Sequence, residues 1–318
     1  MMKSRLFAHY GRLAFRAVVT GGVLIDVAHT ECRPSVSTNR FYAAVSSNSV
    51  NEHDHKVHTS CCGFPKNLIG GASMVLDQGV IGEDACFIAR INNTYVVGVA
   101  DGVGGWRKYG IDPSEFSSRL MNICSDIVRK GEFEPMRPDL LLAKAFETLA
   151  LPPRPVGSST ACVLIVHRGM LHSANLGDSG YLVLRKGEIV YKSREQTHYF
   201  NAPFQLSLPP ENSPFSGFIG DSPDMAELHS ISLKSGDIIV LATDGLWDNV
   251  SENLIVEQLK DIQPGDLQSA CNSLALSARR LAFDTRHTSP FAVKASKHGI
   301  DAPGGKPDDI TLVLLLIA

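Results

Sequence analysis

Apolar residues fall in short runs from about residue 67 onward, and this pattern predicts β-strands. The runs are TYVVGVA (94–100), TACVLIVH (160–167), GYLVLRKGEIVYKS (180–193), DIIVLAT (237–243) and ITLVLLLI (310–317). Their length and their content of β-branched residues are typical of strands. In the third run, Lys186-Gly187 separates two halves rich in strand formers, which indicates a hairpin.

Between these runs, apolar residues recur every three or four positions, which is the spacing of an amphipathic helix. The first predicted helix begins with Asp112 as N-cap, Pro113 at the first position and Glu115 completing a capping box, and it ends at Gly131. Its inward residues are Phe116, Leu120, Ile123 and Ile127. Further helices are predicted over about 138–150 (Leu142, Phe146 and Leu149 inward), from Ser251 (Leu254, Ile255 and Leu259 inward) and over about 266–282.

Hairpin-linked strands and separate blocks of helices predict an α+β protein, in which antiparallel sheets carry helices on their outer faces. A doubly wound parallel fold would instead alternate strand and helix. Residues 67–318 contain neither an internal repeat nor a linker, so we expect one domain there. Residues 36–66 are rich in Ser, Asn, His and Thr without an apolar period, which predicts a polar linker.

The N-terminal segment has the composition of a mitochondrial transit peptide. It holds Lys3, Arg5, Arg12 and Arg16, and no acidic residue before Asp26. Arg-rich, acid-free starts of this kind direct import into mitochondria. A secretory signal is the alternative, because 17–25 is fairly apolar, but the arginines are spread through the segment instead of standing at its start. We therefore expect 1–35 to be a transit peptide and the protein to reside in the mitochondrial matrix.

The overall composition is that of a globular protein. Of the 318 residues, 44% are hydrophobic and the net charge is −3, with no basic block interleaved with aromatics, so no nucleic-acid surface is expected. The longest apolar candidate, 17–28, is too short to span a membrane. The seven cysteines are irregularly spaced, which predicts reduced thiols and no disulfide-linked partner. Cys61 and Cys62 follow three histidines, but their spacing matches no standard zinc site.

Acidic residues stand at the ends of the predicted strands, most of them beside glycines. They are Asp101 in YVVGVADGVGGW, Asp178 in HSANLGDSG, Asp244 in DIIVLATDGLWDN, the pair Asp308 and Asp309 in GGKPDDIT, and the pair Glu83 and Asp84 in GEDACFIA. A single acid in such a place is usually a turn or helix-cap residue. If several converge, their charges raise one another's pKa and require cations. Carboxylates without His or Cys suit magnesium or manganese better than zinc.

Taken in order, these segments resemble the metal-dependent protein phosphatases, the protein phosphatase 2C-like serine/threonine phosphatases. The set is GEDA, VADGVGGW, GSSTACV, NLGDSG, ATDGLWDN and KPDDIT, and it covers essentially 67–318. The resemblance implies a four-layer α/β/β/α sandwich of two packed antiparallel sheets flanked by helices. The GGWR, HYFNAPFQLS and GGKPDDIT segments are most similar to the mitochondrial branch of the family.

The resemblance also implies a ligand set for two Mn²⁺ or Mg²⁺ ions and a weaker third. Asp101 matches the aspartate that bridges two ions, and Gly102 matches the glycine whose carbonyl binds one of them. The other matches are Asp244 and Asp308 as direct ligands, Asp309 where many members have Asn, Glu83 and Asp84 as the acidic pair of the second metal, and Asp178 with Asp248 at the third.

The chemistry that the resemblance implies is hydrolysis of phosphoserine and phosphothreonine in proteins. In this family a water between the two ions attacks phosphorus in line, without a covalent enzyme intermediate. Asp101 and Asp244 match the catalytic aspartates, and mitochondrial phosphoproteins are the expected substrates. The long polar segments 196–225 and 283–308 are expected to select among them.

Two positions depart from the family pattern. Val103 stands where a His often serves as general acid, and Gly79 stands where an Arg often binds substrate phosphate. Leaving-group protonation and phosphate capture then need other groups. Arg107 is our candidate for the phosphate, with a surface arginine on a turn as the alternative. Lys306, beside Asp308, is interpreted as a turn residue rather than a phosphate contact.

Two other catalytic sites are excluded by local sequence. Cys162 and Arg168 have the spacing of a Cys-dependent phosphatase, but the residues between them form a strand that cannot wrap around phosphate. The stretch Gly102-Val103-Gly104 lacks the last glycine of a dinucleotide motif. A non-enzymatic function stays open: a pseudophosphatase that binds phosphoproteins as a scaffold would keep the fold, but it would not need the metal ligands.

Overall fold

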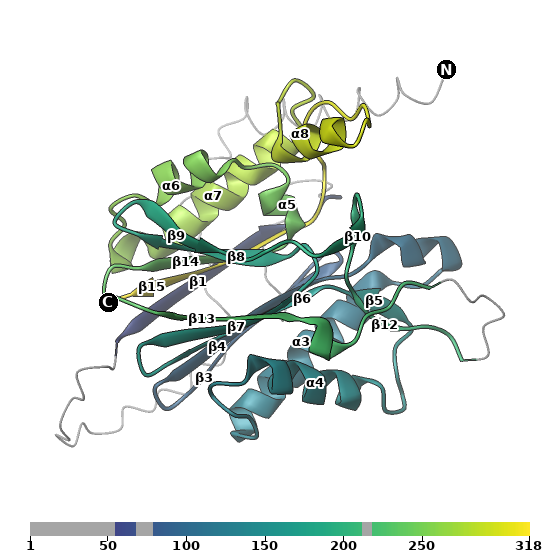
Figure 1. The fold of residues 1–318 in the computed structure, drawn as a ribbon, viewed down its shortest axis with the longest axis horizontal. Helices are drawn as coiled ribbons and strands as arrows, with labels where there is room; N and C mark the ends of the chain where they lie inside the picture. The colour runs from purple at the N-terminus through teal and green to yellow at the C-terminus, as the bar shows by residue number, and fades with distance from the viewer. Residues whose placement is uncertain (1–54, 68–78, 212–217) are drawn as a thin grey trace.

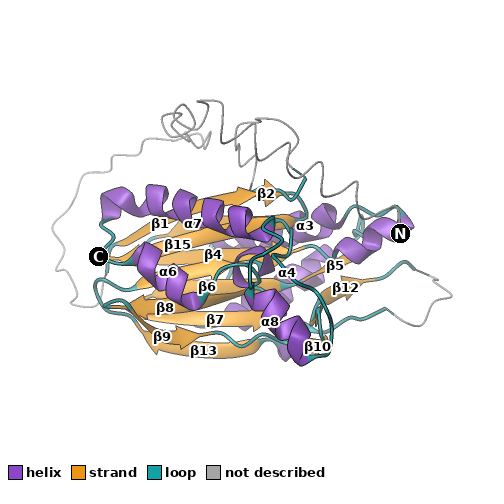
Figure 2. Cartoon of the chain, turned by 90° about the horizontal axis from the view of Figure 1, so that it is seen from above, coloured by secondary structure: helices purple, strands orange, loops and turns teal. Residues whose placement is uncertain are grey.

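Two antiparallel β-sheets pack face to face at the centre of the computed structural model, which describes residues 55–67, 79–211 and 218–318. Helices cover the outer face of each sheet, so the layers run α/β/β/α (Figure 1). The view from above shows α6 and α7 lying over the strands beneath them (Figure 2). This arrangement confirms the predicted fold class.

The sheet that contains both ends of the described chain has five strands among those residues, in the order β1-β15-β14-β8-β9. Their bounds are Val57–Phe64 (β1), Ile310–Ile317 (β15), Ile238–Ala242 (β14), Gly180–Arg185 (β8) and Glu188–Lys192 (β9). The predicted hairpin is present between β8 and β9. Lys186 and Gly187 both have positive φ, at 54° and 77°, as a tight hairpin turn of this twist requires.

The second sheet has six strands within the described residues, in the order β13-β7-β6-β4-β3-β2. Their bounds are Glu227–Ser232 (β13), Met170–Leu176 (β7), Ala161–His167 (β6), Thr94–Asp101 (β4), Asp84–Ile91 (β3) and Val80–Ile81 (β2). Two small ladders pair β10 (Thr197–Tyr199) with β11 (Ala202–Pro203), and β12 (Leu206–Leu208) with β5 (Gly157–Ser159). Part of the segment 196–225 is therefore ordered as short strands.

The helices divide between the two outer faces (Figure 1). On the six-stranded sheet lie α3 (Pro113–Lys130) and α4 (Pro138–Leu149), and on the five-stranded sheet lie α5 (Asp244–Trp247), α6 (Glu252–Leu259) and α7 (Leu267–Ala282). Helix α8 (Pro290–Lys297) lies on the same side as α5–α7 but farther from the strands (Figure 1). Short 3-10 turns cover Gly104–Tyr109 (η1), Pro223–Met225 (η2) and Pro264–Asp266 (η3). No helix within the described ranges combines the length and the apolarity that crossing a bilayer requires.

Helix α3 begins and ends where the sequence predicts. The side chain of Asp112 accepts a hydrogen bond from the Ser114 amide at 3.1 Å, with Pro113 at the first helical position. At the other end Gly131 has φ 72° and donates its amide to the last turn. Phe116 and Leu120, on the predicted inward face, are completely buried.

Strand β15 lies between two apolar layers, and this explains its unbroken run of apolar residues. Val313, Leu315 and Ile317 face the layer between the sheets, whereas Leu312 and Leu314 face helix α7. Because both faces are covered, the alternation of polar and apolar residues that marks a half-exposed strand is missing.

The predicted linker 36–66 is wrong at its C-terminal end. Val57–Phe64 form strand β1, which pairs antiparallel with β15 from Val57↔Ile317 to Phe64↔Ile310. The strand lacks an apolar pattern because His58 and Thr59 lie half-buried on an edge strand. Its backbone hydrogen bonds hold it in the sheet. The remainder of the linker and the predicted transit peptide 1–35 lie outside the described residues.

The polar segment 283–308 contains helix α8, which the sequence analysis did not predict. The helix has a sequence signal: Ser289 accepts a hydrogen bond from the Ala292 amide at 3.0 Å, and Pro290 is the first helical residue. Among the described residues, Cys61, Cys86, Cys124, Cys162 and Cys271 form no disulfide bond.

The layer between the sheets carries much of the stability, and we predict that Leu315→Ala lowers the free energy of unfolding by about 2–5 kcal/mol. Leu315 has no exposed surface, so its truncation leaves a cavity between the two sheets. Leu276→Ala is the matched control, because Leu276 on α7 is 45% exposed and its truncation should change stability by less than about 0.5 kcal/mol. Denaturant unfolding measures both, and equal losses would contradict the assigned core.

Candidate metal centre

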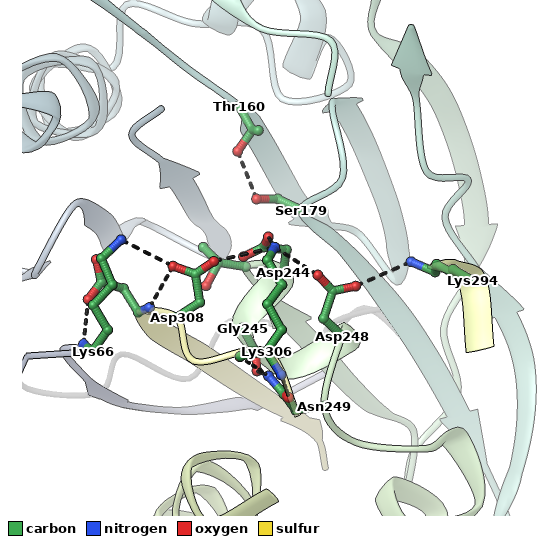
Figure 3. A network of polar contacts seen from close by, with 12 residues as sticks. Lys66, Thr160, Ser179, Asp244, Gly245, Asp248, Asn249, Lys294, Lys306 and Asp308 are labelled. Carbon is green, nitrogen blue, oxygen red and sulfur yellow. Dashed lines mark hydrogen bonds and ion pairs between the residues drawn. The ribbon is translucent and has the colours of Figure 1, made fainter. Parts of the chain in front are cut away.

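The acidic residues singled out from the sequence gather where strands of both sheets end. Asp84 begins β3 and Asp101 ends β4, and the ladder pairs these two residues directly. From the other sheet, Asp244 follows β14 as the first residue of α5, and Asp308 and Asp309 precede β15. The two sheets thus bring together carboxylates that are far apart in the sequence. Figure 3 shows those of the five-stranded side, with Asp308 and Asp248 on either side of Asp244.

Thr243 ties the two halves of this cluster together. Its hydroxyl donates to Asp84 Oδ2 at 2.7 Å and accepts from the Thr311 amide at 3.1 Å. The turn from β14 into α5 is tight, because a Cβ on Gly245 would lie 2.0 Å from the carbonyl oxygen of Asp309. The DG pair in ATDGLWDN therefore needs its glycine for packing, and that packing fixes Asp244.

Gly102 is required for a similar reason. A Cβ at this position would lie 2.6 Å from the carbonyl oxygens of both Glu83 and Pro113. The amide of Gly102 donates to the Glu83 carbonyl at 3.1 Å, which joins the end of β4 to the GEDA turn. The absence of a side chain lets these backbones approach the Asp101 end of the cluster.

The pKa values show that the carboxylates lie close enough to repel one another. Burial, together with the charges of Asp309 and Asp244, raises the pKa of Asp84 well above its usual range. Burial likewise raises the pKa of Asp101, and the charges of Asp244 and Asp84 add to the effect. The carboxylates can remain ionised together only with cations nearby.

Two lysines supply positive charge in the structure as it stands, and neither was assigned there from the sequence. Lys66 Nζ lies 2.5 Å from Glu83 Oε2 and 3.3 Å from Asp308 Oδ1. Lys306 Nζ contacts Asp244 and lies 3.3 Å from Asp308 Oδ2. The interpretation of Lys306 as a turn residue is therefore wrong for its side chain, which enters the cluster. Within the described ranges, no three His, Cys, Asp or Glu side chains already form a metal-ligand group.

Asp309 uses both of its carboxylate oxygens to hold the backbone. Oδ1 accepts the Lys66 amide at 2.6 Å, and Oδ2 accepts the Glu83 amide at 2.8 Å. These bonds fix the GEDA turn against the start of β15, so Asp309 positions Glu83.

Asp178 lies on the turn after β7 and has an unsatisfied oxygen. Its Oδ1 is buried and has no hydrogen-bond partner in the described part of the chain. Burial, then the charge of Asp244, raises the pKa of Asp178 well above its usual value. The neighbouring Ser179 hydroxyl contacts Thr160 Oγ1 at 2.8 Å, and Thr160 accepts the Asp101 amide at 3.1 Å, so the turn is linked to β4 (Figure 3).

This donor set fits hard divalent cations. It consists of clustered carboxylates with mutually raised pKa values, one buried oxygen without a partner, and a glycine where the backbone must be bare. Carboxylate and carbonyl oxygens are the ligands that Mg²⁺ and Mn²⁺ prefer.

The two departures from the family pattern have different structural settings. Gly79 has φ 78°, and a Cβ there would lie 2.3 Å from the Cys86 carbonyl oxygen, so an arginine cannot occupy this position without a shift of the backbone. Arg107 lies on η1 beside the cluster, where its guanidinium contacts Glu83 Oε1. Its side chain is 56% exposed, which leaves much of its hydrogen-bonding surface open to solvent.

Comparison with known proteins identifies close relatives. No protein-family model matches the chain. It is 46% identical to the Xenopus laevis protein phosphatase PTC7 homolog over 272 residues, which cover 83% of this chain and 90% of the relative. It is 42% identical to the human protein phosphatase PTC7 homolog over 316 residues, 97% of each chain.

Solved structures show the same fold. The photosystem II phosphatase PBCP superposes with a TM-score of 0.70 and 31% identity, over 83% of this chain and 99% of PBCP. The catalytic domain of the serine/threonine phosphatase PstP, solved with two manganese ions, superposes with a TM-score of 0.52 at 17% identity over 82% of this chain and 98% of that domain, a likeness of fold alone.

Proposed function

The chain belongs to the metal-dependent, protein phosphatase 2C-like family of protein phosphatases, and from this premise we propose that it dephosphorylates phosphoserine and phosphothreonine at the acidic cluster between its sheets. One observation supports placing the reaction at this cluster: the segments that resemble the family's metal motifs converge there. Asp84 pairs with Asp101 on one sheet, and on the other Asp244 and Asp308 both contact Lys306. A scaffold that only binds phosphoproteins would not need this costly concentration of charge.

Two Mn²⁺ or Mg²⁺ ions are the proposed cofactors, and when bound they supply positive charge for the phosphoryl group and activate water. The residues proposed to hold them are Asp101, Gly102, Asp244, Asp308, Glu83 and Asp84. The oxygen chemistry of this set and the raised pKa values of Asp84 and Asp101 support the assignment, as do the two manganese ions bound by PstP, which has the same fold. Asp309 is proposed to act through Glu83, whose amide it holds.

The protein's own groups would prepare the site for substrate. Thr243 holds Asp84 in place, and Gly102 keeps the end of β4 close to the GEDA turn. Arg107 is proposed to receive the substrate phosphate, because it lies at the rim of the cluster and is half exposed. An arginine can bind phosphate through two parallel hydrogen bonds. It would replace the arginine that cannot fit at Gly79.

We also propose that the protein acts in the mitochondrial matrix on phosphoproteins there. The support is the composition of residues 1–35, in which arginines are scattered and acids are missing before Asp26.

Hydrolysis should depend on the metal and on Asp244. We predict that the chain hydrolyses a phosphothreonine peptide with Mn²⁺, that chelation abolishes the activity, and that Asp244→Asn lowers kcat/KM at least about a hundredfold, because a charged ligand is lost. Phosphate release measures the rate. Asp266→Asn is the control, since Asp266 lies on η3 and is exposed. Peptide binding without hydrolysis in the unmodified protein would instead establish the scaffold function.

Removing Arg107 should weaken substrate binding more than turnover. Arg107→Ala is expected to raise KM roughly tenfold with little change in kcat, if the guanidinium binds the phosphate equally in ground and transition states. Arg90→Ala is the matched control, because Arg90 is an exposed arginine on β3 that stacks on Tyr95. An unchanged KM in Arg107→Ala would show that Arg107 is a surface residue that does not bind the substrate phosphate.

The proposed mitochondrial targeting is tested separately from the enzymatic activity. Residues 1–35 fused to a fluorescent protein should direct it to mitochondria, and replacing the four basic residues of that segment's first half with glutamine should leave it in the cytosol. Delivery of the original fusion to the secretory pathway would establish the alternative signal.

A further inference from the structure

Lys306 lies among the carboxylates at one end of the cluster. Its ammonium contacts Asp244 Oδ2, and it lies 2.9 Å from Asp248 Oδ2 and 3.3 Å from Asp308 Oδ2. Figure 3 shows the side chain running from Asn249 toward these carboxylates. Asp244 and Asp248 stand one helical turn apart on and after α5, so a single cation can contact both.

The backbone of Lys306 is held at two points. Its amide donates to Asn249 Oδ1 at 2.8 Å, and its carbonyl accepts from Asn249 Nδ2 at 2.9 Å. Asn249 follows Asp248 directly, so one residue ties the lysine to the carboxylate that it meets. The preceding Gly305 packs so closely that a Cβ would lie 2.0 Å from the Leu281 carbonyl oxygen. The lysine is therefore positioned by the fold of the loop.

A second lysine meets the other oxygen of Asp248. Lys294 Nζ, on α8, lies 3.4 Å from Asp248 Oδ1 and 2.6 Å from Glu195 Oε2. Helix α8 is joined to the Lys306 loop, because the Ser289 hydroxyl donates to the Gly304 carbonyl at 2.5 Å. Both oxygens of a buried carboxylate thus face ammonium groups.

The ammonium of Lys306 therefore contacts Asp244 and Asp248, two of the three acids that would otherwise hold a third ion. The third acid, Asp178, has a buried oxygen without a hydrogen-bond partner in the described part of the chain.

We propose that Lys306, assisted by Lys294, takes the place of a third divalent cation beside Asp178, Asp244 and Asp248, so that this chain binds two metal ions and not three. The inference rests on the proposed metal centre. Lys66 differs from Lys306 in being more exposed, at 28% against 16% of the side chain, and a metal at Glu83 can displace it toward solvent. Lys306 is less exposed, and Asn249 holds its backbone beside Asp248.

The number of bound ions tests the proposal directly. The full chain is dialysed to equilibrium against increasing Mn²⁺, and the metal in the protein compartment is measured by mass spectrometry. We expect two Mn²⁺ per chain in the unmodified protein and in Lys306→Arg, and a third in Lys306→Met, where the carboxylates lose their internal cation. Lys66→Met is the matched control, which should bind the same two ions more tightly.

The outcomes separate this inference from the proposed function. Three ions in the unmodified protein, or two in a folded Lys306→Met, would overturn the role of Lys306 while leaving the phosphatase centre intact. Fewer than two ions in the unmodified protein would overturn the proposed centre itself, and the inference with it. If Lys306→Met does not fold, Lys306→Gln, which removes the charge and keeps a polar side chain, decides: a third ion supports the proposal, and a count that stays at two overturns it.

Discussion

Repulsion among buried carboxylates is the constraint on which the rest of this structure depends. Asp84, Asp101, Asp244 and Asp308 come from the ends of strands in two different sheets, and burial together with neighbouring charge raises the pKa of Asp84, Asp101 and Asp308. Such a cluster opposes folding unless cations balance it. The sandwich supplies the opposing stabilisation through three apolar layers, one between the sheets and one beneath each set of helices.

The cluster is balanced differently at its two ends. On the side of Glu83, the positive charges are a half-buried lysine, Lys66, and a largely exposed arginine, Arg107, and in the proposal both move away when other cations or a phosphate arrive. On the side of Asp248, two lysines are fixed by a clamped loop and a helix. This asymmetry supports the proposal that metal ions and substrate replace Lys66 and Arg107, whereas Lys306 stays as a counter-charge beside Asp248.

The sequence predicted those parts of the molecule whose determinants are local. Three features are recognisable from their own residues: the cap at Asp112, the apolar run of β15 and the glycines beside the acids. The resemblance to the family then indicated that the acids form one site. Strand β1 was missed because its place depends on the backbone of β15, about 250 residues away in the chain, and not on its own polar side chains. Helix α8 had a Ser-Pro start that pattern analysis passed over.

The parts of the site that could not be predicted depend on contacts between distant segments. Nothing near Lys66 or Lys306 in the sequence indicates which acids they meet, because Glu83, Asp244 and Asp248 reach them only through the packing of the two sheets. The reason for Gly79 likewise appears only when the Cys86 carbonyl lies against it.

The central claim is that the acids at the junction of the sheets form a dinuclear metal centre. Anomalous diffraction at the manganese absorption edge, from crystals grown with Mn²⁺, tests it most directly. The account predicts two manganese peaks among Asp101, Asp244, Asp308 and the Glu83-Asp84 pair, with the ammonium of Lys306 still beside Asp248. Manganese bound only elsewhere on the protein, with those carboxylates still paired to lysines, would contradict it.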